Sequence, residues 1–146
     1  MTIFRQVTDA FYASPQIDPD DVARAKAMGI AMIVNNRPDR EEAGQPDARA
    51  IEDAANAAGI DYVDIPVGPA GFGQAQIEAL GAALARAKGP VLAFCRSGTR
   101  STYLWSLARA KAGAEPQAIM ASAAGAGYDL SPLRPTLDAI AAGARD

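Results

Sequence analysis

Pro90-Val91-Leu92-Ala93-Phe94-Cys95-Arg96-Ser97-Gly98-Thr99-Arg100-Ser101 is the stretch that decides the fold of this 146-residue chain. Its apolar start follows Gly89 and predicts a buried strand over 90–94. Beyond the loop, apolar residues return at helical spacing at Leu104, Trp105 and Ala108. The stretch therefore predicts a core strand, a tight loop and a helix in direct succession.

Cys95, the sole cysteine, stands where the strand ends and the helix begins. Unpaired amides at a helix start carry the positive end of the helix dipole, so they favour an anion there. Arg96 and Arg100 add two permanent positive charges. This environment favours a thiolate over a thiol, and it predicts that Cys95 is a nucleophile and Arg100 an anion ligand.

The chain contains no histidine, so neither a Cys–His pair nor an imidazole metal ligand is possible. A single cysteine excludes an internal disulfide and a multi-cysteine metal site. We therefore expect no metal and no cofactor, and activation of Cys95 must come from amides, the helix dipole and arginine.

Length and charge limit the possible functions. A chain of 146 residues with 49% hydrophobic residues suits a single domain over 1–146. Its net charge of −3 argues against a nucleic-acid surface. No run approaches the roughly 18 apolar residues that span a membrane, and the N-terminus does not resemble a signal peptide. We expect a soluble cytoplasmic protein without a nucleic-acid or membrane partner.

Strands and helices alternate along the chain. The predicted strands cover 11–14, 30–34, 62–67 and 90–94. The predicted helices begin at Asp18-Pro19 and Asp47, cover about 74–88, follow the Cys95 loop, and cover about 116–124 and 132–143, the last with Ser131 as N-cap. This order predicts a single α/β domain with a mostly parallel sheet flanked by helices.

Ligands of such sheets bind beyond the carboxyl ends of the strands. Three predicted loops meet there, namely 35–42, 66–73 and 95–100. The predicted anion-binding residues are Asn36, Arg37, Arg96, Ser97, Gly98, Thr99 and Ser101, with Gly98 allowing a positive φ. Simpler alternatives exist: Arg96 facing solvent, Ser101 as a first-turn residue, the asparagines as turn formers, and Glu41 and Glu42 as solvated charges.

The loop Cys95–Ser101 resembles the active loop of rhodanese-type sulfurtransferases. Together with 11–14, 35–39, 65–67 and 127–131, it is similar to a bacterial phosphatase-like domain found alone or fused to β-lactamase-like hydrolases that process persulfides. The resemblance covers nearly the whole chain. It implies the fold of dual-specificity phosphatases, and it suggests a persulfide-processing enzyme as a partner.

The two activities make different demands on the loop. The phosphatases of this fold place five residues between cysteine and arginine, whereas four separate Cys95 from Arg100. They also use an acid in the loop that corresponds to 66–73, which here has none. These departures favour a sulfurtransferase, in which Cys95 takes a sulfane sulfur from thiosulfate or a persulfide as a Cys95 persulfide and passes it to a low-molecular-weight thiol.

Two alternatives remain open at this point. One is a cysteine-dependent phosphatase that hydrolyses phosphomonoesters with Cys95 and Arg100. The other is a non-catalytic redox or anion-binding module. The sulfurtransferase and both alternatives predict that a small sulfur-containing or anionic ligand binds at Cys95.

Overall fold

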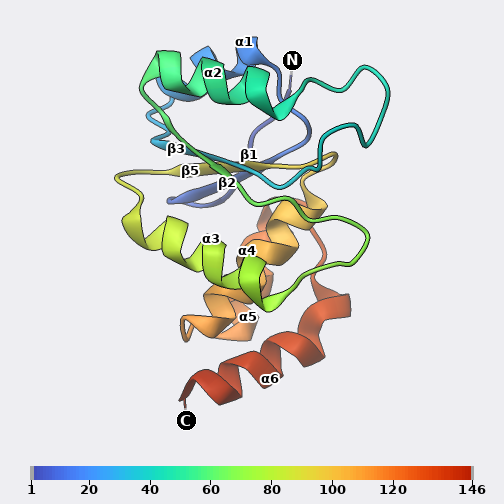
Figure 1. Cartoon of the computed structure of the whole chain (residues 1–146). Coiled ribbons are helices and arrows are strands. Elements are labelled where there is room, and N and C mark those ends of the chain that lie inside the picture. Colours follow the sequence, from blue (N-terminus) through green and yellow to red (C-terminus); the bar gives the residue numbers. More distant parts are fainter. Residues whose placement is uncertain (1, 146) are drawn as a thin grey trace.

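A five-stranded sheet forms the centre of the computed structural model, which describes residues 2–145 (Figure 1). The ends of the predicted domain, Met1 and Asp146, lie outside the described residues. The strand order is β1-β2-β5-β3-β4, with β1 antiparallel to β2 and the other pairs parallel. The strands are β1 Arg5–Thr8, β2 Phe11–Ser14, β3 Met32–Asn35, β4 Asp61–Asp64 and β5 Val91–Phe94.

The central strand β5 is buried on both faces, as its continuous apolar run predicts. Its side chains alternate between two cores: Leu92 and Phe94 face one, and Val91 and Ala93 face the other. Phe94 pairs with Ser14 of β2 and with Asn35 of β3. The carboxyl ends of these three strands therefore meet at one edge of the sheet.

Six α-helices and one 3₁₀ helix surround the sheet within residues 2–145. They are α1 Pro19–Ala27, α2 Ala48–Ala58, α3 Gln74–Arg86, α4 Thr99–Lys111, α5 Pro116–Gly125, η1 Ser131–Leu133 and α6 Arg134–Arg145. The helices α1 and α2 cover one face, while α3, α4, α5 and α6 lie on the other (Figure 1). The α/β fold with a mostly parallel sheet flanked by helices is thus confirmed.

Local signals in the sequence set several helix ends. Asp18 forms a capping box with Asp21, and Pro19 occupies the first turn of α1. Gly59 ends α2 in the left-handed conformation, at φ 74°. Asp47 stands at the N-cap position of α2, but its side chain makes no capping hydrogen bond there.

Three elements differ from the sequence predictions. The edge strand β1 is missing from them, because only Val7 of its four residues is buried and the apolar signal is weak. The strand predicted over 62–67 ends at Asp64, since Pro66 has no N–H to continue a ladder. Ser131 is the first residue of η1 rather than the cap of a helix, so α6 begins at Arg134.

Candidate active site

Cys95 is the first residue after β5 and is fully buried. Its backbone N–H donates to the Ser14 carbonyl oxygen at 3.3 Å, which ties the start of the loop to β2. Its Sγ accepts a hydrogen bond from the Gly98 N–H at 3.0 Å. The sulfur therefore has a backbone donor within its own loop, as an anionic nucleophile requires.

Gly98 makes the tight loop possible. It is the N-cap residue of α4 and has a φ of 95°, the left-handed conformation that the sequence predicts. The Ser97 hydroxyl accepts from the Thr99 N–H at 3.3 Å, and the Thr102 hydroxyl donates to the Gly98 carbonyl at 2.8 Å. These bonds close the loop onto the first turn of α4, so Thr99 and Arg100 are helical.

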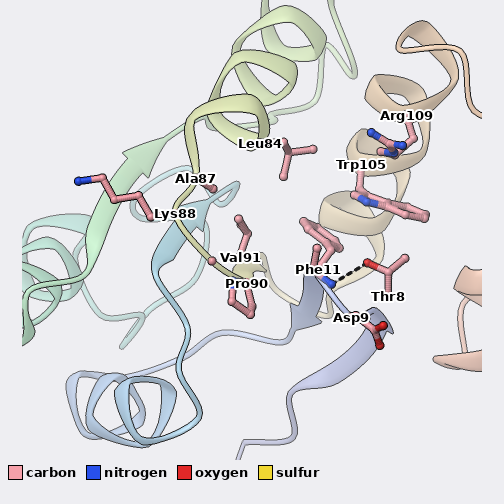
Figure 2. A pocket seen from close by; sticks show the side chains of 12 residues that line it. Thr8, Asp9, Phe11, Leu84, Ala87, Lys88, Pro90, Val91, Trp105 and Arg109 are labelled. Carbon is pink, nitrogen blue, oxygen red and sulfur yellow. Dashed lines mark hydrogen bonds between the residues drawn. The ribbon is translucent and has the colours of Figure 1, made fainter.

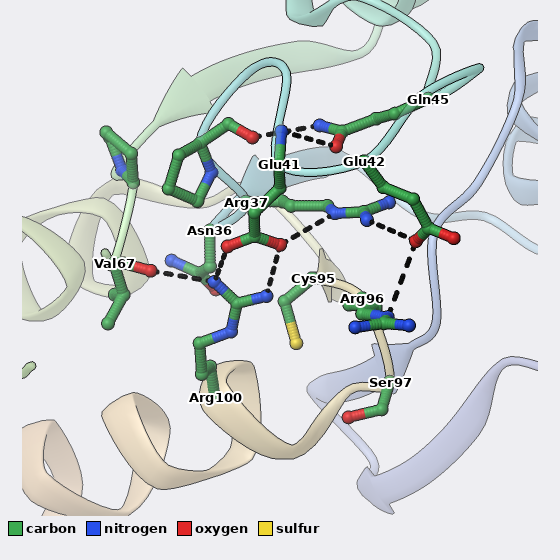
Figure 3. Close-up of polar contacts among 12 residues, drawn as sticks. Asn36, Arg37, Glu41, Glu42, Gln45, Val67, Cys95, Arg96, Ser97 and Arg100 are labelled. Atoms are coloured by element: carbon green, nitrogen blue, oxygen red, sulfur yellow. Dashed lines mark hydrogen bonds and ion pairs between the residues drawn. The ribbon is translucent and has the colours of Figure 1, made fainter. Parts of the chain in front are cut away.

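Arg100 brings the three predicted loops together (Figure 3). Its Nη1 and Nη2 donate to the two carboxylate oxygens of Glu41 at 2.6 and 2.8 Å, and Nη1 also donates to the Val67 carbonyl at 2.8 Å. The hydrogen bond to Glu41, and the nearby Cys95 charge, raise the pKa of Arg100 above its ordinary value. Arg100 thus stays charged beside the sulfur and links it to the loops after β3 and β4.

Glu41 is a bound carboxylate rather than the solvated charge that the sequence suggests. Its side chain is 28% exposed, and it also accepts from Arg37 Nε at 2.9 Å. The hydrogen bond from Arg100 is the main reason that the pKa of Glu41 is lowered from 4.5 to about 2, with Arg37 acting in the same direction. Glu41 is ionised at neutral pH, so it holds Arg100 and does not donate protons.

Arg37 and Arg96 extend this ion network. Arg37 is 4% exposed and donates to Glu42 at 3.1 Å and to the Gln16 amide oxygen at 3.0 Å, besides Glu41. Arg96 is 68% exposed and pairs with Glu42 at 3.5 Å. The structure therefore places Arg96 at the solvent-facing rim, and Arg37 beneath the segment 38–47 that it anchors.

Asn36 and Ser101 are fully buried close to this network. The Asn36 amide donates to the Ile65 carbonyl at 2.9 Å, and its backbone N–H donates to the Phe94 carbonyl at 2.8 Å. Asn36 Oδ1 and Ser101 Oγ have no protein hydrogen-bond partner. Asn36 thus holds the ends of β3 and β5 together, and Ser101 lies in the first turn of α4.

Asp39 and Asp129, two aspartates outside the loop 66–73, accept hydrogen bonds at helix starts. The Asp39 carboxylate accepts from the Ala48 N–H at 2.8 Å, at the start of α2. The Asp129 carboxylate accepts from the Ser131 N–H at 2.9 Å, and hydrogen bonding to Ser131 lowers the pKa of Asp129. Both carboxylates are therefore engaged in turns.

A cavity of about 710 Å³ lies at the opposite edge of the sheet (Figure 2). It is lined by the amino ends of β2 and β5 together with Leu84, Trp105 and Arg109. Trp105 stacks on Phe11 at 5.5 Å between ring centroids, which confirms its place in the core. The whole length of β5 separates this cavity from Cys95, so the chemistry lies elsewhere.

Tyr128 is a residue near Cys95 that the sequence analysis did not single out. It follows α5, and its hydroxyl donates to the Ser97 carbonyl at 3.3 Å. The segment 127–131 is part of the family resemblance, but no local pattern indicates that it reaches the Cys95 loop. Within residues 2–145, no three histidine, cysteine or carboxylate residues are grouped to hold a metal ion, and no helix has the length and apolarity to cross a membrane.

Comparisons with known proteins give consistent matches. Residues 3–112 match the family model for the phosphatase-like domain of β-lactamase hydrolase-like protein. The β-lactamase hydrolase-like protein of Agrobacterium fabrum (strain C58 / ATCC 33970) is 43% identical over 90 residues, which are 62% of this chain and 21% of that protein. The chain thus spans about a fifth of the length of this relative.

Solved structures agree with the family match. A protein of Neisseria meningitidis Z2491, described as a candidate phosphatase, is 34% identical, with a TM-score of 0.81 over 93% of this chain and 96% of that chain. The kinase associated phosphatase has a TM-score of 0.65 at 17% identity, over 97% of this chain and 96% of that chain. The second match concerns the fold alone and confirms the dual-specificity-phosphatase-like architecture.

These matches contradict the predicted rhodanese-type sulfurtransferase, because family and structural neighbours are phosphatase-like. That prediction rested on the four residues between Cys95 and Arg100 and on the missing acid in the loop 66–73. In the structure, α4 already begins at Thr99, so the short loop still brings the Gly98 N–H and the Arg100 guanidinium to Cys95. Residue count alone is therefore a poor measure of which anion the loop accepts.

Proposed function

The chain belongs to the family of the phosphatase-like domain of β-lactamase hydrolase-like proteins, and on that premise we propose that it is a cysteine-dependent phosphatase that hydrolyses phosphomonoesters. The observation that supports this most directly is the arrangement at the start of α4. A buried Cys95 Sγ accepts the Gly98 N–H at 3.0 Å, and the Arg100 guanidinium lies beside it. A nucleophile, backbone donors and a planar cation suit a phosphoryl group.

Arg100 has donors left for a substrate. Hydrogen bonds to Glu41 and to the Val67 carbonyl use both Nη1 protons and one Nη2 proton. A guanidinium carries five N–H donors, so Nε–H and the second Nη2–H remain for phosphoryl oxygens. Glu41 thus fixes the plane of Arg100 while leaving one edge of it for the anion.

The reaction has two steps. The Cys95 thiolate attacks phosphorus, a P–S bond forms, and the ester P–O bond breaks; the leaving oxygen takes a proton from solvent water. Water then attacks the phosphocysteine, which releases inorganic phosphate and returns the thiolate. Arg100 and the loop amides stabilise the charge on the three phosphoryl oxygens in both steps.

Access to Cys95 requires a movement. Cys95 is fully buried, and the Arg100 guanidinium beside it is held by Glu41. Glu41 belongs to the segment 38–47, of which Asp39, Arg40, Glu41 and Glu42 are exposed. We propose that the part of this segment beyond Glu41 shifts outward when a phosphomonoester enters, because the exposed Glu42 carboxylate repels the arriving anion, while Glu41 stays on Arg100.

The compartment and the partners follow from the same proposal. A sole cysteine that must stay reduced suits the cytoplasm. The substrate is a small anionic phosphomonoester. A persulfide-processing partner enzyme stays a prediction from the family resemblance.

The experiment is hydrolysis of p-nitrophenyl phosphate by the purified full chain. We expect turnover in the wild type, and a loss on the order of 10³-fold or more in Cys95→Ser. Arg109→Ala, at the opposite edge of the sheet, is the matched control and should retain full activity. Binding of phosphate without turnover would replace the proposal with a non-catalytic anion-binding module, and activity retained in Cys95→Ser would exclude Cys95 as nucleophile.

A further inference from the structure

The peptide unit between Ser97 and Gly98 touches two functional groups at once. Its N–H, from Gly98, donates to Cys95 Sγ at 3.0 Å. Its C=O, from Ser97, accepts from the Tyr128 hydroxyl at 3.3 Å. Because a trans peptide is planar, its N–H and C=O point in opposite directions. Cys95 and Tyr128 therefore form hydrogen bonds with opposite edges of the same peptide unit.

Tyr128 is itself held firmly. It follows Gly127, which has a φ of 95°, and its backbone N–H donates to the Ala123 carbonyl at 2.9 Å. Arg5 Nη1 donates to the neighbouring Ala126 carbonyl at 3.4 Å. Only 8% of Tyr128 is exposed. The C-terminal end of α5 therefore presents the hydroxyl to the Cys95 loop in a defined position.

Tyr128 also packs directly on Gly98. A Cβ built on Gly98 would lie 2.1 Å from the Tyr128 hydroxyl oxygen and 3.0 Å from Cζ of the ring. The ring thus fills the space beside the loop that any other residue at position 98 would need. The loop therefore cannot bulge toward α5, and this contact limits its path.

Burial keeps the proton on the Tyr128 phenol. Burial raises the pKa of Tyr128, the Cys95 charge raises it further, and Arg5 lowers it. Arg100 of α4 is a charged group beside Cys95, and Glu41 of the loop after β3 holds Arg100 there. Tyr128 is therefore a neutral donor at neutral pH, and the hydroxyl proton is available to the Ser97 carbonyl.

The Ser97–Gly98 peptide needs the restraint that its contacts with Tyr128 supply. Glycine adopts positive and negative φ with similar ease, so a flip of the Ser97–Gly98 peptide meets little steric resistance of its own. The flipped peptide would turn a carbonyl oxygen toward Cys95 Sγ and remove its N–H donor. A carbonyl next to a thiolate, or next to a phosphoryl oxygen, is repulsive.

We propose that Tyr128 is a positioning residue, which holds the Ser97–Gly98 peptide with its N–H on Cys95 and thereby stabilises the thiolate. The hydrogen-bonded hydroxyl and the ring against Gly98 act together in this role. The effect on the thiolate is independent of the substrate, whereas its consequence for turnover rests on the proposed phosphatase function.

The test is Tyr128→Phe in the full chain, with the thiolate followed by its ultraviolet absorbance as pH is varied. Cys95 is the sole cysteine, so subtraction of the Cys95→Ser curve isolates its signal. Loss of the restraint should move the midpoint of the curve to higher pH by roughly 0.5 to 1, as expected when one hydrogen bond to the thiolate weakens. The rate of aryl phosphate hydrolysis at saturation should fall about 3- to 10-fold, with KM changed less.

Tyr103→Phe is the matched control. Its hydroxyl donates to the Asp129 carbonyl at 3.4 Å, so the same atom is removed from a similar bond that does not involve the Cys95 loop. The midpoint of its thiolate curve should equal that of the wild type. Thermal unfolding of both variants checks that the fold is retained.

Two results overturn the proposal: an unchanged midpoint in Tyr128→Phe, or an equal displacement in Tyr103→Phe. A displaced midpoint in a protein that hydrolyses no phosphomonoester would uphold the role of Tyr128 and reject the phosphatase function. The experiment can therefore reject the role of Tyr128 or the phosphatase function without rejecting the other.

Discussion

At the residue scale, Glu41 is a carboxylate that the sequence suggests is a solvated charge, but it belongs to the site because it pairs with Arg100. The two residues are 59 positions apart and join through two hydrogen bonds of 2.6 and 2.8 Å. About a quarter of each side chain is exposed, so solvent weakens the pair without cancelling it. The geometry of the pair orients the Arg100 guanidinium that would bind the phosphate.

The Glu41–Arg100 pair makes stability depend on pH in acid. The pKa of Glu41 is about 2 in the folded chain against an ordinary 4.5. Its contribution is therefore complete above about pH 4.5 and is lost as pH falls toward 2. The full difference between the two pKa values would correspond to about 3 kcal/mol of unfolding free energy. Solvent screening of this partly exposed pair reduces the contribution to about 1–2 kcal/mol.

Glu41→Gln should accordingly lower the free energy of unfolding by about 1–2 kcal/mol at pH 7 and by almost nothing near pH 2. Urea denaturation at a series of pH values measures this difference. Asp53→Asn, which removes an exposed ion pair with Arg49, is the control and should change stability by less than about 0.5 kcal/mol. A Glu41→Gln effect that stays constant with pH would show that the charge is not responsible.

At the element scale, the segment 38–47 depends on one buried side chain. Arg37 donates to Gln16, Glu41 and Glu42, at 3.0, 2.9 and 3.1 Å respectively. These partners come from the loops after β2 and β3, so Arg37 fastens the segment to the sheet edge. The segment is exposed beyond that anchor, which suits the outward shift that we propose for it.

Arg37→Met should loosen this segment. We expect the free energy of unfolding to fall by about 1–3 kcal/mol, because two carboxylates and an amide lose a buried donor. Hydrogen–deuterium exchange over 38–47 should accelerate, while exchange in β5 should change little. Arg49→Met, on the exposed face of α2, is the control; equal acceleration in both variants would contradict the anchoring role.

At the scale of the whole molecule, the part of the chain after residue 112 completes the site from outside the matched family segment. That segment ends at residue 112, whereas α5, η1 and α6 follow it. The helix α6 packs on α4, and Leu137 of α6 is fully buried in the same core as Leu104 of α4. The position of α4, and with it the Cys95 loop, therefore depends on these helices.

Leu137→Ala should lower the free energy of unfolding by about 2–5 kcal/mol, since it leaves a cavity between α6 and α4. Chemical denaturation measures the loss. Ile3→Ala, at a residue 62% exposed, should change stability by less than about 0.5 kcal/mol. A small loss for Leu137→Ala would mean that α6 is dispensable for the core.

Much of the fold could be predicted from local signals. The apolar run of β5, the Asp18 capping box and the left-handed Gly59 and Gly98 depend on neighbours within a few residues. The edge strand β1 could not, because a strand with one buried face and four residues carries little pattern. The segment Arg5–Thr8 is a strand because it pairs with β2, and this pairing is a tertiary contact.

The sequence by itself determined the nucleophile, its loop, the left-handed Gly98 and the resemblance that names the family. Only the tertiary structure decided that Arg100 takes Glu41 and the Val67 carbonyl as partners, and that Tyr128 reaches the Ser97 carbonyl across 31 residues. The reason is physical: loop conformation follows from local φ and hydrogen bonding, whereas contacts between loops follow from strand order. Loop length does not show how α4 and the neighbouring loops place Arg100, which is why counting residues in the loop supported a sulfurtransferase that the phosphatase-like relatives contradict.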